Sequence, residues 1–332
     1  MNVRRTIVMA ACMLLVLACA RWNENMSAYL TAVKEGTRTA YPALARVTAA
    51  ADADSELYAV IKQEATKRYV APVDAKVDRV WHAVPGYNGL EIDIEQTYKA
   101  ALAAGKTSSS AITYVFREIP PKVSLDDLGE QPIYRGNPNK PMVSLMINVA
   151  WGNEYLDSML NTLDREGVKA TFFLDGSWLK KNPELAKTIQ SRGHEMSNHA
   201  YSHPDMKTLD RQSQWNQIAK TEALLKSTLG VSNRFFAPPS GSYNATTVKV
   251  AAEQGLKTVL WTLDTVDWRK PSPSWILNRI GNGIEPGSLI LMHPTASARD
   301  SLAGIIKLAR SKGYALGTVS QTLSPERVKV SG

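Results

Sequence analysis

Midway along the chain the sequence reads Asn198-His199-Ala200-Tyr201-Ser202-His203-Pro204, which places two histidines four residues apart. Only five histidines occur in the 332 residues, and another of them, His293, follows the apolar run Leu289–Met292 far downstream. Imidazole nitrogen is a common ligand of Zn²⁺, and metal-assisted hydrolysis uses such sites. The pattern therefore indicates a metal-assisted hydrolytic site. The alternative is that these are partly buried structural histidines with satisfied hydrogen bonds.

Apolar runs that alternate with helical segments extend on both sides of this stretch. The apolar runs are Val143–Val149, Ala170–Leu174, Phe235–Phe236, Thr258–Leu263, Leu289–Met292 and Ala315–Val319. The segment His194–Asn198, directly before the first histidine of the pair, falls where another strand end is expected. Seven β/α units predict an α/β fold with a parallel sheet closed, or nearly closed, as a distorted (β/α)7 barrel. In such barrels the chemistry sits at the C-terminal ends of the strands, where the histidine segments fall.

Two helix starts in this region are signalled by a capping residue directly before a proline. These are Asn182 before Pro183 and Ser272 before Pro273. Proline is favoured at the first helical position, and asparagine and serine are favoured at the position before it. We therefore expect a helix to begin at each proline.

The part of the chain before the barrel has a different pattern and predicts a small α/β module. Ala49–Thr66 has the composition of a helix, Leu90–Ile94 alternates as a strand does, and Thr97–Ala104 is typical of a second helix. Ile112–Phe116 predicts another strand. Gly129–Pro141, rich in proline and glycine, indicates a linker. A spacer is the expected role of this module.

The N-terminus predicts export. Arg4 and Arg5 precede the apolar run Thr6–Ala20, whose 15 residues are short for a spanning helix of about 20 but suit a signal segment. Both cysteines, Cys12 and Cys19, lie inside this run, so the exported body has no disulfide to form. Val16-Leu17-Ala18-Cys19 resembles a bacterial lipobox. We expect an extracytoplasmic protein held at the membrane by an uncleaved anchor or a lipidated Cys19, or a secreted one if it is cleaved without lipidation.

These patterns divide the chain into three parts. Residues 1–21 are the expected signal peptide or anchor, residues 22–139 the small module with its stalk and linker, and residues 140–325 the barrel. The formal net charge of +8 favours anionic surroundings. Lysine and arginine are scattered rather than clustered, so no nucleic-acid partner is expected.

Several short motifs, met in order along residues 140–323, resemble those of the polysaccharide deacetylases, the NodB-homology family of carbohydrate esterase type. The motifs are Ala170–Phe173, Gly193–His199, Pro238-Pro239 with Gly241, Trp261–Trp268, and Leu291 with His293. The wider sequence is similar to the sporulation-associated branch of that family. The resemblance implies a distorted barrel that uses a divalent metal, Zn²⁺ being the expected ion, to remove N-acetyl groups from chitin-like or peptidoglycan glycan.

The resemblance also assigns roles to individual residues. His199 and His203 would hold the metal, His293 would be the general acid, and Asp267 would stabilise its imidazolium form. An apolar wall around the acetyl methyl would come from three residues that could equally be ordinary core packing, namely Trp268, Leu291 and Pro238.

The chain departs from the family at the positions of its two aspartates. Ala150 stands where the base is expected and Trp151 where the third metal ligand is expected, and neither side chain can accept a proton or bind zinc. Asp175, at the end of the second predicted strand, is a candidate surrogate base or ligand, with Glu154 as a second option. The alternative role of Asp175 is to cap the helix that contains Trp178.

Two functions follow from these residues. The first is a membrane-attached, metal-dependent hydrolase that removes N-acetyl groups from cell-wall glycan. The second is a non-catalytic barrel that binds glycan, which the Ala150-Trp151 departure favours. A third candidate, a protein that binds anionic polymers, is supported only by the positive net charge.

Overall fold

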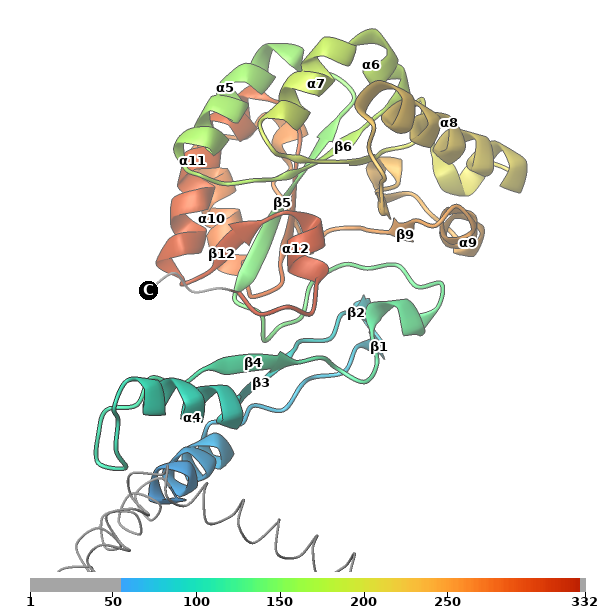
Figure 1. Cartoon of the computed structure of the whole chain (residues 1–332). Helices are drawn as coiled ribbons and strands as arrows, with labels where there is room; N and C mark the ends of the chain where they lie inside the picture. Colours follow the sequence, from blue (N-terminus) through green and yellow to red (C-terminus); the bar gives the residue numbers. More distant parts are fainter. Residues whose placement is uncertain (1–54, 329–332) are drawn as a thin grey trace, which may run out of the picture. The chain divides into compact units, whose positions relative to one another are not determined.

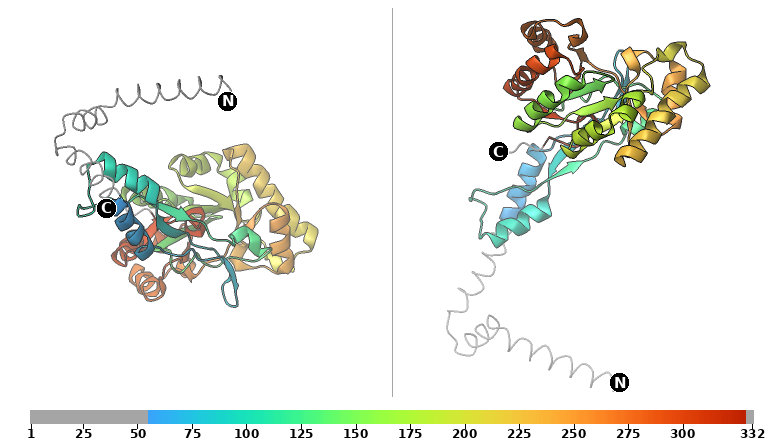
Figure 2. Two further views of the ribbon diagram at one scale, coloured as in Figure 1. Left: turned by 60° about the horizontal axis from the view of Figure 1, so that its bottom comes forward. Right: turned by 90° about the horizontal axis from the view of Figure 1, so that it is seen from above.

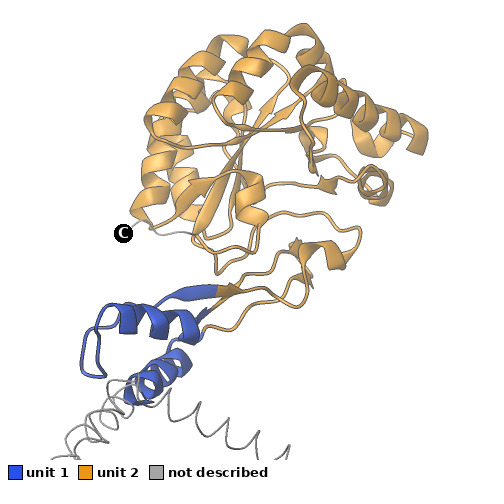
Figure 3. Cartoon of the chain, in the orientation of Figure 1, with its two compact units in different colours: residues 1–69, 91–117 blue, residues 70–90, 118–332 orange. Residues whose placement is uncertain are grey.

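The computed structural model describes residues 55–328, and the chain divides into two compact units (Figure 3). Unit 1 comprises Met1–Tyr69 and Glu91–Arg117, and unit 2 comprises Val70–Leu90 and Glu118–Gly332. Unit 2 thus includes residues on both sides of the expected boundary between 139 and 140. The three-part domain division stays a prediction, and the expected signal segment lies outside the described residues.

Unit 1 is a small helical body. Residues 55–67 are helical, and α4 spans Ile94–Ala103, with Asp93 as its N-cap accepting from the backbone N–H of Gln96 at 2.9 Å. The helix predicted at Thr97–Ala104 is therefore confirmed, and so is the helix predicted at Ala49–Thr66 from residue 55 onward, since residues 49–54 lie outside the described residues. Four buried residues form its core: Leu57, Ile61, Ile92 and Ala101.

The strands next to these helices confirm one prediction and correct another. β3 spans Gly89–Ile92, as the alternation predicts, and pairs with β4 at Phe116–Ile119. The prediction of a strand at Ile112–Phe116 is wrong except at its last residue. Ile112 packs its side chain against the core of unit 1 without entering a ladder, so apolar character there reflects packing rather than strand pairing.

Unit 2 contains an eight-stranded parallel sheet. Its strands are β5 Met142–Val149, β6 Thr171–Leu174, β7 Glu195–Asn198, β8 Phe235–Phe236, β9 Lys257–Thr258, β10 Leu263–Asp264, β11 Leu289–Met292 and β12 Ala315–Gly317. The order is β10-β11-β5-β6-β7-β8-β9, with β12 also paired to β5. The sheet curls but stays open between β9 and β10, which confirms the distorted barrel. Outside it, β1 at Lys76–Asp78 and β2 at His82–Val84 form an antiparallel hairpin.

Two sequence expectations fail where the barrel is open. The single strand predicted at Thr258–Leu263 is split into β9 and β10, because Ile133 occupies the pairing groups between them. Ile133 donates to the carbonyl of Thr258 at 2.9 Å and accepts from the N–H of Leu260 at 2.7 Å. The expected linker Gly129–Pro141 is therefore a strap against the barrel, and its Ile133 is fully buried.

Helices surround the sheet of unit 2 (Figures 1 and 2). They are α5 Asn153–Arg165, α6 Gly176–Lys181, α7 Pro183–Ser191, α8 Arg211–Leu229, α9 Ala245–Glu253, α10 Pro273–Gly283, α11 Ala296–Ser311 and α12 Val319–Leu323. The largest buried cluster joins β5, β6 and β11 to α5, α10 and α11, which accounts for the continuous apolar run of β5. The residues that follow Val149 thus come directly after a strand that is buried from Val143 onward.

Both predicted helix starts are observed, but only one uses its cap. Ser272 accepts from the N–H of Trp275 at 3.3 Å at the start of α10. Asn182 makes no capping bond to α7, because its side chain is engaged elsewhere. Its Nδ2 donates to the carbonyl of Trp178 at 2.9 Å, and its Oδ1 accepts from Asn153 at 2.8 Å.

Among the helices of residues 55–328, none combines the length and the apolar character needed to cross a membrane. The apolar run Thr6–Ala20 and Cys19 lie outside these residues.

Candidate active site

His199 and His203 come together at the C-terminal end of β7, as predicted. Their ring centroids are 5.2 Å apart and their planes meet at 71°. His199 is fully buried, and its Nδ1 is hydrogen-bonded to the carbonyl of Ala237 at 2.7 Å. Burial and the neighbouring His203 lower the pKa of His199 to about 3. Its imidazole is therefore neutral at physiological pH with Nε2 left free, the state in which histidine binds a metal.

The backbone of this loop is held in an unfavourable conformation. Ala200 has φ of 60° and His203 has φ of 54°, both in the left-handed region that costs about 1–2 kcal/mol for an L-residue. Asn198 holds the turn, since its Oδ1 accepts from the N–H of Ala200 at 2.8 Å and its Nδ2 donates to Glu222 at 2.7 Å. Strain that is held by a buried network in this way is typical of functional loops.

The predicted acid pair is also assembled. His293 follows β11, and Asp267 begins the short helix η5 at Asp267–Arg269. His293 Nδ1 lies 3.2 Å from Asp267 Oδ1, and the His293 N–H donates to Asp267 Oδ2 at 2.9 Å. Thr265 Oγ1 also donates to Asp267 Oδ2, at 2.5 Å. The fully buried Asp267 therefore fixes both the backbone and the ring of His293.

One residue of each pair, His203 and His293, lines a groove of about 440 Å³. Its lining residues are Asn148, Trp151, His203, Ser240, Trp261, Asp264, Trp268, Leu291 and His293. Trp268 and Leu291 thus stand where the resemblance places them. Pro238 does not line the groove, because it is buried at the start of the turn η4 at Pro239–Gly241. The sequence analysis assigned no role to Asn148. A polar residue near the end of so apolar a strand was the signal that could have indicated a site residue.

The two departures from the family have a physical consequence at the end of β5. Within residues 55–328 no three His, Cys, Asp or Glu side chains gather closely enough to hold a metal ion. His199 and His203 therefore fit a metal as two ligands, with no third protein ligand beside them. Trp151 is 47% exposed, and its indole lies parallel to His293, with centroids 6.0 Å apart and an interplanar angle of 8°.

Asp175 has the capping role that the sequence left open. It is the N-cap of α6, and its Oδ1 accepts from the N–H of Trp178 at 2.9 Å and from Ser177 Oγ at 2.6 Å. Its Oδ2 is buried and has no hydrogen-bond partner in the described part of the chain, and burial raises the pKa of this carboxyl group. Glu154, in the first turn of α5, is exposed and outside the groove lining.

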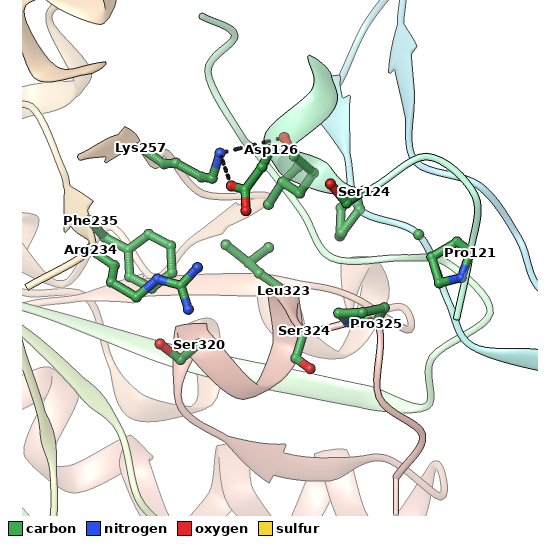
Figure 4. A pocket seen from close by; sticks show the side chains of 13 residues that line it. Pro121, Ser124, Asp126, Arg234, Phe235, Lys257, Ser320, Leu323, Ser324 and Pro325 are labelled. Carbon is green, nitrogen blue, oxygen red and sulfur yellow. Dashed lines mark hydrogen bonds and ion pairs between the residues drawn. The ribbon is translucent and has the colours of Figure 1, made fainter. Parts of the chain in front are cut away.

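A second hollow of about 290 Å³ lies in unit 2 where β8 and β9 begin, at the end of the barrel away from the histidines (Figure 4). Lys257 forms an ion pair with Asp126 at 2.7 Å on its wall, and Arg234 reaches toward Ser320 (Figure 4). None of the predicted site residues lines this hollow.

Comparison with known proteins identifies the class of this barrel. Residues 135–259 match the family model for polysaccharide deacetylases. The chain is 44% identical over 306 residues to the uncharacterized protein YlxY of Bacillus subtilis, covering 92% of each chain. It is 36% identical over 185 residues to a peptidoglycan-N-acetylglucosamine deacetylase of Bacillus cereus, covering 54% of this chain and 67% of that one. The chain belongs to the polysaccharide deacetylase family.

A solved structure matches most of the chain. It is wild-type BA3943 of Bacillus anthracis, a CE4 family pseudoenzyme, with 41% sequence identity and a TM-score of 0.75. The match covers 82% of this chain and 96% of that one.

Proposed function

We propose that this protein acts on N-acetylated cell-wall glycan as a metal-dependent deacetylase of low turnover. The observation that carries the proposal is that His203 and His293 line one groove, with His199 directly beside the first and Asp267 directly beside the second. Relatives of the same family include a peptidoglycan-N-acetylglucosamine deacetylase. Peptidoglycan and chitin-like chains are therefore the substrates to test.

The retained residues supply a defined part of the chemistry. His199 and His203 would hold a divalent metal, with Zn²⁺ the expected ion, which polarises the carbonyl of the N-acetyl group when it is bound. His293 would donate a proton to the nitrogen of the departing amine, and this role is supported by the hydrogen bond between its Nδ1 and Asp267 Oδ1. Trp268 and Leu291 exclude water from the acetyl methyl.

The missing part is the base. Attack by water on an amide requires a group that takes the proton, and Ala150 cannot do so. General base catalysis contributes about 10²–10⁴-fold, so we expect turnover to be lower by that factor than in a relative with both aspartates. The structural relative BA3943 is a pseudoenzyme, and a mutant of it has restored enzymatic activity, which supports a groove whose deficit is limited to a few residues.

Asp175 remains a proposal as a surrogate base. Its support is the buried Oδ2, which has no hydrogen-bond partner in the described residues. The surrogate-ligand role has less support, because the described residues contain no three-ligand cluster. Asp175→Asn tests the idea cleanly, since asparagine is also a good N-cap. Unchanged acetate release by this variant would exclude Asp175 as the base.

The second candidate function is glycan binding without turnover. Trp151 favours it, because an exposed aromatic ring beside His293 suits sugar binding better than water activation. The two candidates share the groove and the ligand and differ only in acetate release.

The cellular setting is also proposed. The N-terminal segment supports export, with attachment to the membrane through an anchor or a lipidated Cys19, or secretion after cleavage. The motif pattern supports a role in sporulation or cell-wall modification.

The test is acetate release by the full chain from N-acetylated peptidoglycan and chitooligosaccharides, with Zn²⁺ or Co²⁺ added. We expect slow release that disappears in His203→Ala, together with loss of Zn²⁺ binding in equilibrium dialysis. Zn²⁺ binding without release from any substrate would leave glycan binding as the function.

A further inference from the structure

The turn that carries the two histidines is held from outside by side chains of one helix, α8. Ala200 and His203 both have left-handed backbone conformations, with φ of 60° and 54°. Such conformations persist only where the surrounding structure imposes them. The side chains that impose them on this turn therefore also orient the two histidine rings.

Gln217 of α8 holds the second half of the turn. Its Oε1 accepts from the backbone N–H groups of Tyr201 and Ser202, both at 3.0 Å, and its Nε2 donates to Ser202 Oγ at 3.0 Å. A glutamine amide supplies both the acceptor and the donor that these bonds require. One side chain thus fixes two successive backbone N–H groups directly before His203.

Glu222, also on α8, holds the first half of the turn through Asn198. Its Oε1 accepts from Asn198 Nδ2 at 2.7 Å and from Asn233 Nδ2 at 2.7 Å. Asn198 Oδ1 in turn accepts from the N–H of Ala200 at 2.8 Å. Because Asn198 directly precedes His199, the carboxylate of Glu222 fixes the side chain that sets the backbone on either side of the first histidine.

The carbonyl groups of the same turn are bound by α6, which lies beside α8 (Figure 1). The N–H of Gly176 donates to the carbonyl of Ala200 at 2.9 Å, and the N–H of Ser177 donates to the carbonyl of Tyr201 at 2.7 Å. These bonds are made by backbone groups and do not depend on side-chain identity. The N–H groups of the turn, in contrast, are held by side chains, and those side chains can be tested by substitution.

The way in which the turn is held matters more where few ligands are present. Within residues 55–328 the histidine pair belongs to no cluster of three His, Cys, Asp or Glu side chains that could hold a metal. Ordering a site on binding lowers its affinity, so a two-ligand site depends strongly on ligands that are already held in place. Loss of an outer partner of a metal-binding histidine typically costs about 10–100-fold in metal affinity.

We propose that Gln217 and Glu222 are positioning residues that set the affinity of the His199–His203 pair for a divalent metal. This inference rests on the proposed function in that it takes the histidine pair as the metal site. Gln217 acts on the backbone before His203, and Glu222 acts through Asn198. Neither side chain lines the groove of about 440 Å³, so each acts through the turn and not on a ligand in the groove.

The test is the Zn²⁺ affinity of the full chain, measured by competition with a chromogenic chelator. We expect Gln217→Met to raise the Kd for Zn²⁺ at least about tenfold, because methionine keeps the side-chain length and loses the acceptor. Gln217→Glu keeps an acceptor oxygen and should bind Zn²⁺ at least as tightly as the wild type. The matched control is Gln212→Met, because Gln212 is exposed on α8 and donates to Asn216 in the same helix. Equal Kd values for Gln217→Met and Gln212→Met would overturn the proposal.

A second pair of variants tests Glu222 in the same assay. Glu222→Gln keeps the oxygen that accepts from Asn198 and should bind Zn²⁺ nearly as the wild type does. Glu222→Met loses that oxygen and should raise the Kd at least about tenfold. A lower unfolding midpoint for Glu222→Met with an unchanged Kd would show that Glu222 serves folding alone, and would overturn its positioning role.

Amide hydrogen exchange in the metal-free chain separates this inference from the proposed function. Gln217→Met should speed exchange at the N–H groups of Tyr201 and Ser202 at least about tenfold, and Gln217→Glu should not. Unchanged exchange in Gln217→Met would overturn the positioning role. A wild-type chain that binds no Zn²⁺ would overturn the metal site and this inference with it. Zn²⁺ binding that follows these expectations without acetate release would contradict the deacetylase proposal alone.

Discussion

The indole of Trp151 and the imidazole of His293 lie parallel, with their centroids 6.0 Å apart and their planes 8° apart. His293 is the proposed general acid, and Trp151 stands where the family resemblance places an aspartate that would bind metal. The same relationship therefore explains both candidate functions. The indole of Trp151 is an apolar neighbour of His293, and it is also a surface on which a sugar ring could stack.

The loop that fixes Trp151 should be intolerant of a Cβ at Gly152. In Gly152→Ala the new Cβ would lie 2.0 Å from the carbonyl oxygen of Pro294, and the backbone would also carry the strain of φ +86°. We expect a loss of about 2–4 kcal/mol in the free energy of unfolding, measured by urea denaturation.

The matched control for Gly152 is Gly255→Ala. Gly255 also has positive φ, at +77°, but no atom lies within 4 Å of the position of its Cβ. It should lose only the backbone cost of about 1–2 kcal/mol. Equal losses in the two variants would show that the Pro294 contact does not constrain the loop.

Asp267→Asn should impair both activity and stability. The buried carboxylate accepts from the His293 N–H, the His293 ring and Thr265, and an asparagine has only one oxygen for these donors. We expect acetate release to fall at least about tenfold and the free energy of unfolding to fall by about 1–3 kcal/mol. Asp264→Asn, which loses a carboxylate that accepts only from the N–H of Val266, is the comparison for stability.

Stability should fall in mild acid because of His194. Burial lowers the pKa of His194 to about 4, below its ordinary value of 6.5. The unfolded chain therefore takes up this proton first, so stability is present above about pH 6.5 and is lost as the pH falls toward 4. The shift corresponds to a loss on the order of 3 kcal/mol. Urea denaturation at several pH values should show a shallower decline for His194→Gln, and an identical decline would contradict this assignment.

Much of the barrel could be predicted from the sequence because its strands are buried on both faces. β5, β6 and β11 are apolar runs whose ends coincide closely with the observed strands. The region between β9 and β10 could not be predicted, since its apolar residues pair with Ile133 from a distant proline-rich segment. Local composition carries no signal for such a long-range pairing.

The candidate site likewise has features that could be predicted from the sequence and features that could not. The two pairs of polar residues were predictable, because His199 and His293 follow strands whose C-terminal ends meet in a barrel. The unpaired Oδ1 of Asn148 depends on which donors surround it, and the parallel packing of Trp151 depends on the contact of Gly152 with Pro294. These are properties of the tertiary structure that cannot be predicted from residue type. The position of Pro238 is such a property too, since Pro238 is buried and lies outside the groove lining.

The central claim is that the groove is a deacetylase site whose turnover is limited by the loss of two carboxylates, at Ala150 and Trp151. The most direct measurement compares acetate release by Ala150→Asp/Trp151→Asp with that by Ala150→Asn/Trp151→Asn, at saturating chitooligosaccharide with Zn²⁺. Both variants lose the indole and gain side chains of equal size, so the comparison isolates the carboxylates. The account predicts that the aspartate variant is about 10²–10⁴-fold faster and that a further His203→Ala change abolishes the gain. Equal rates in two folded variants would contradict the claim.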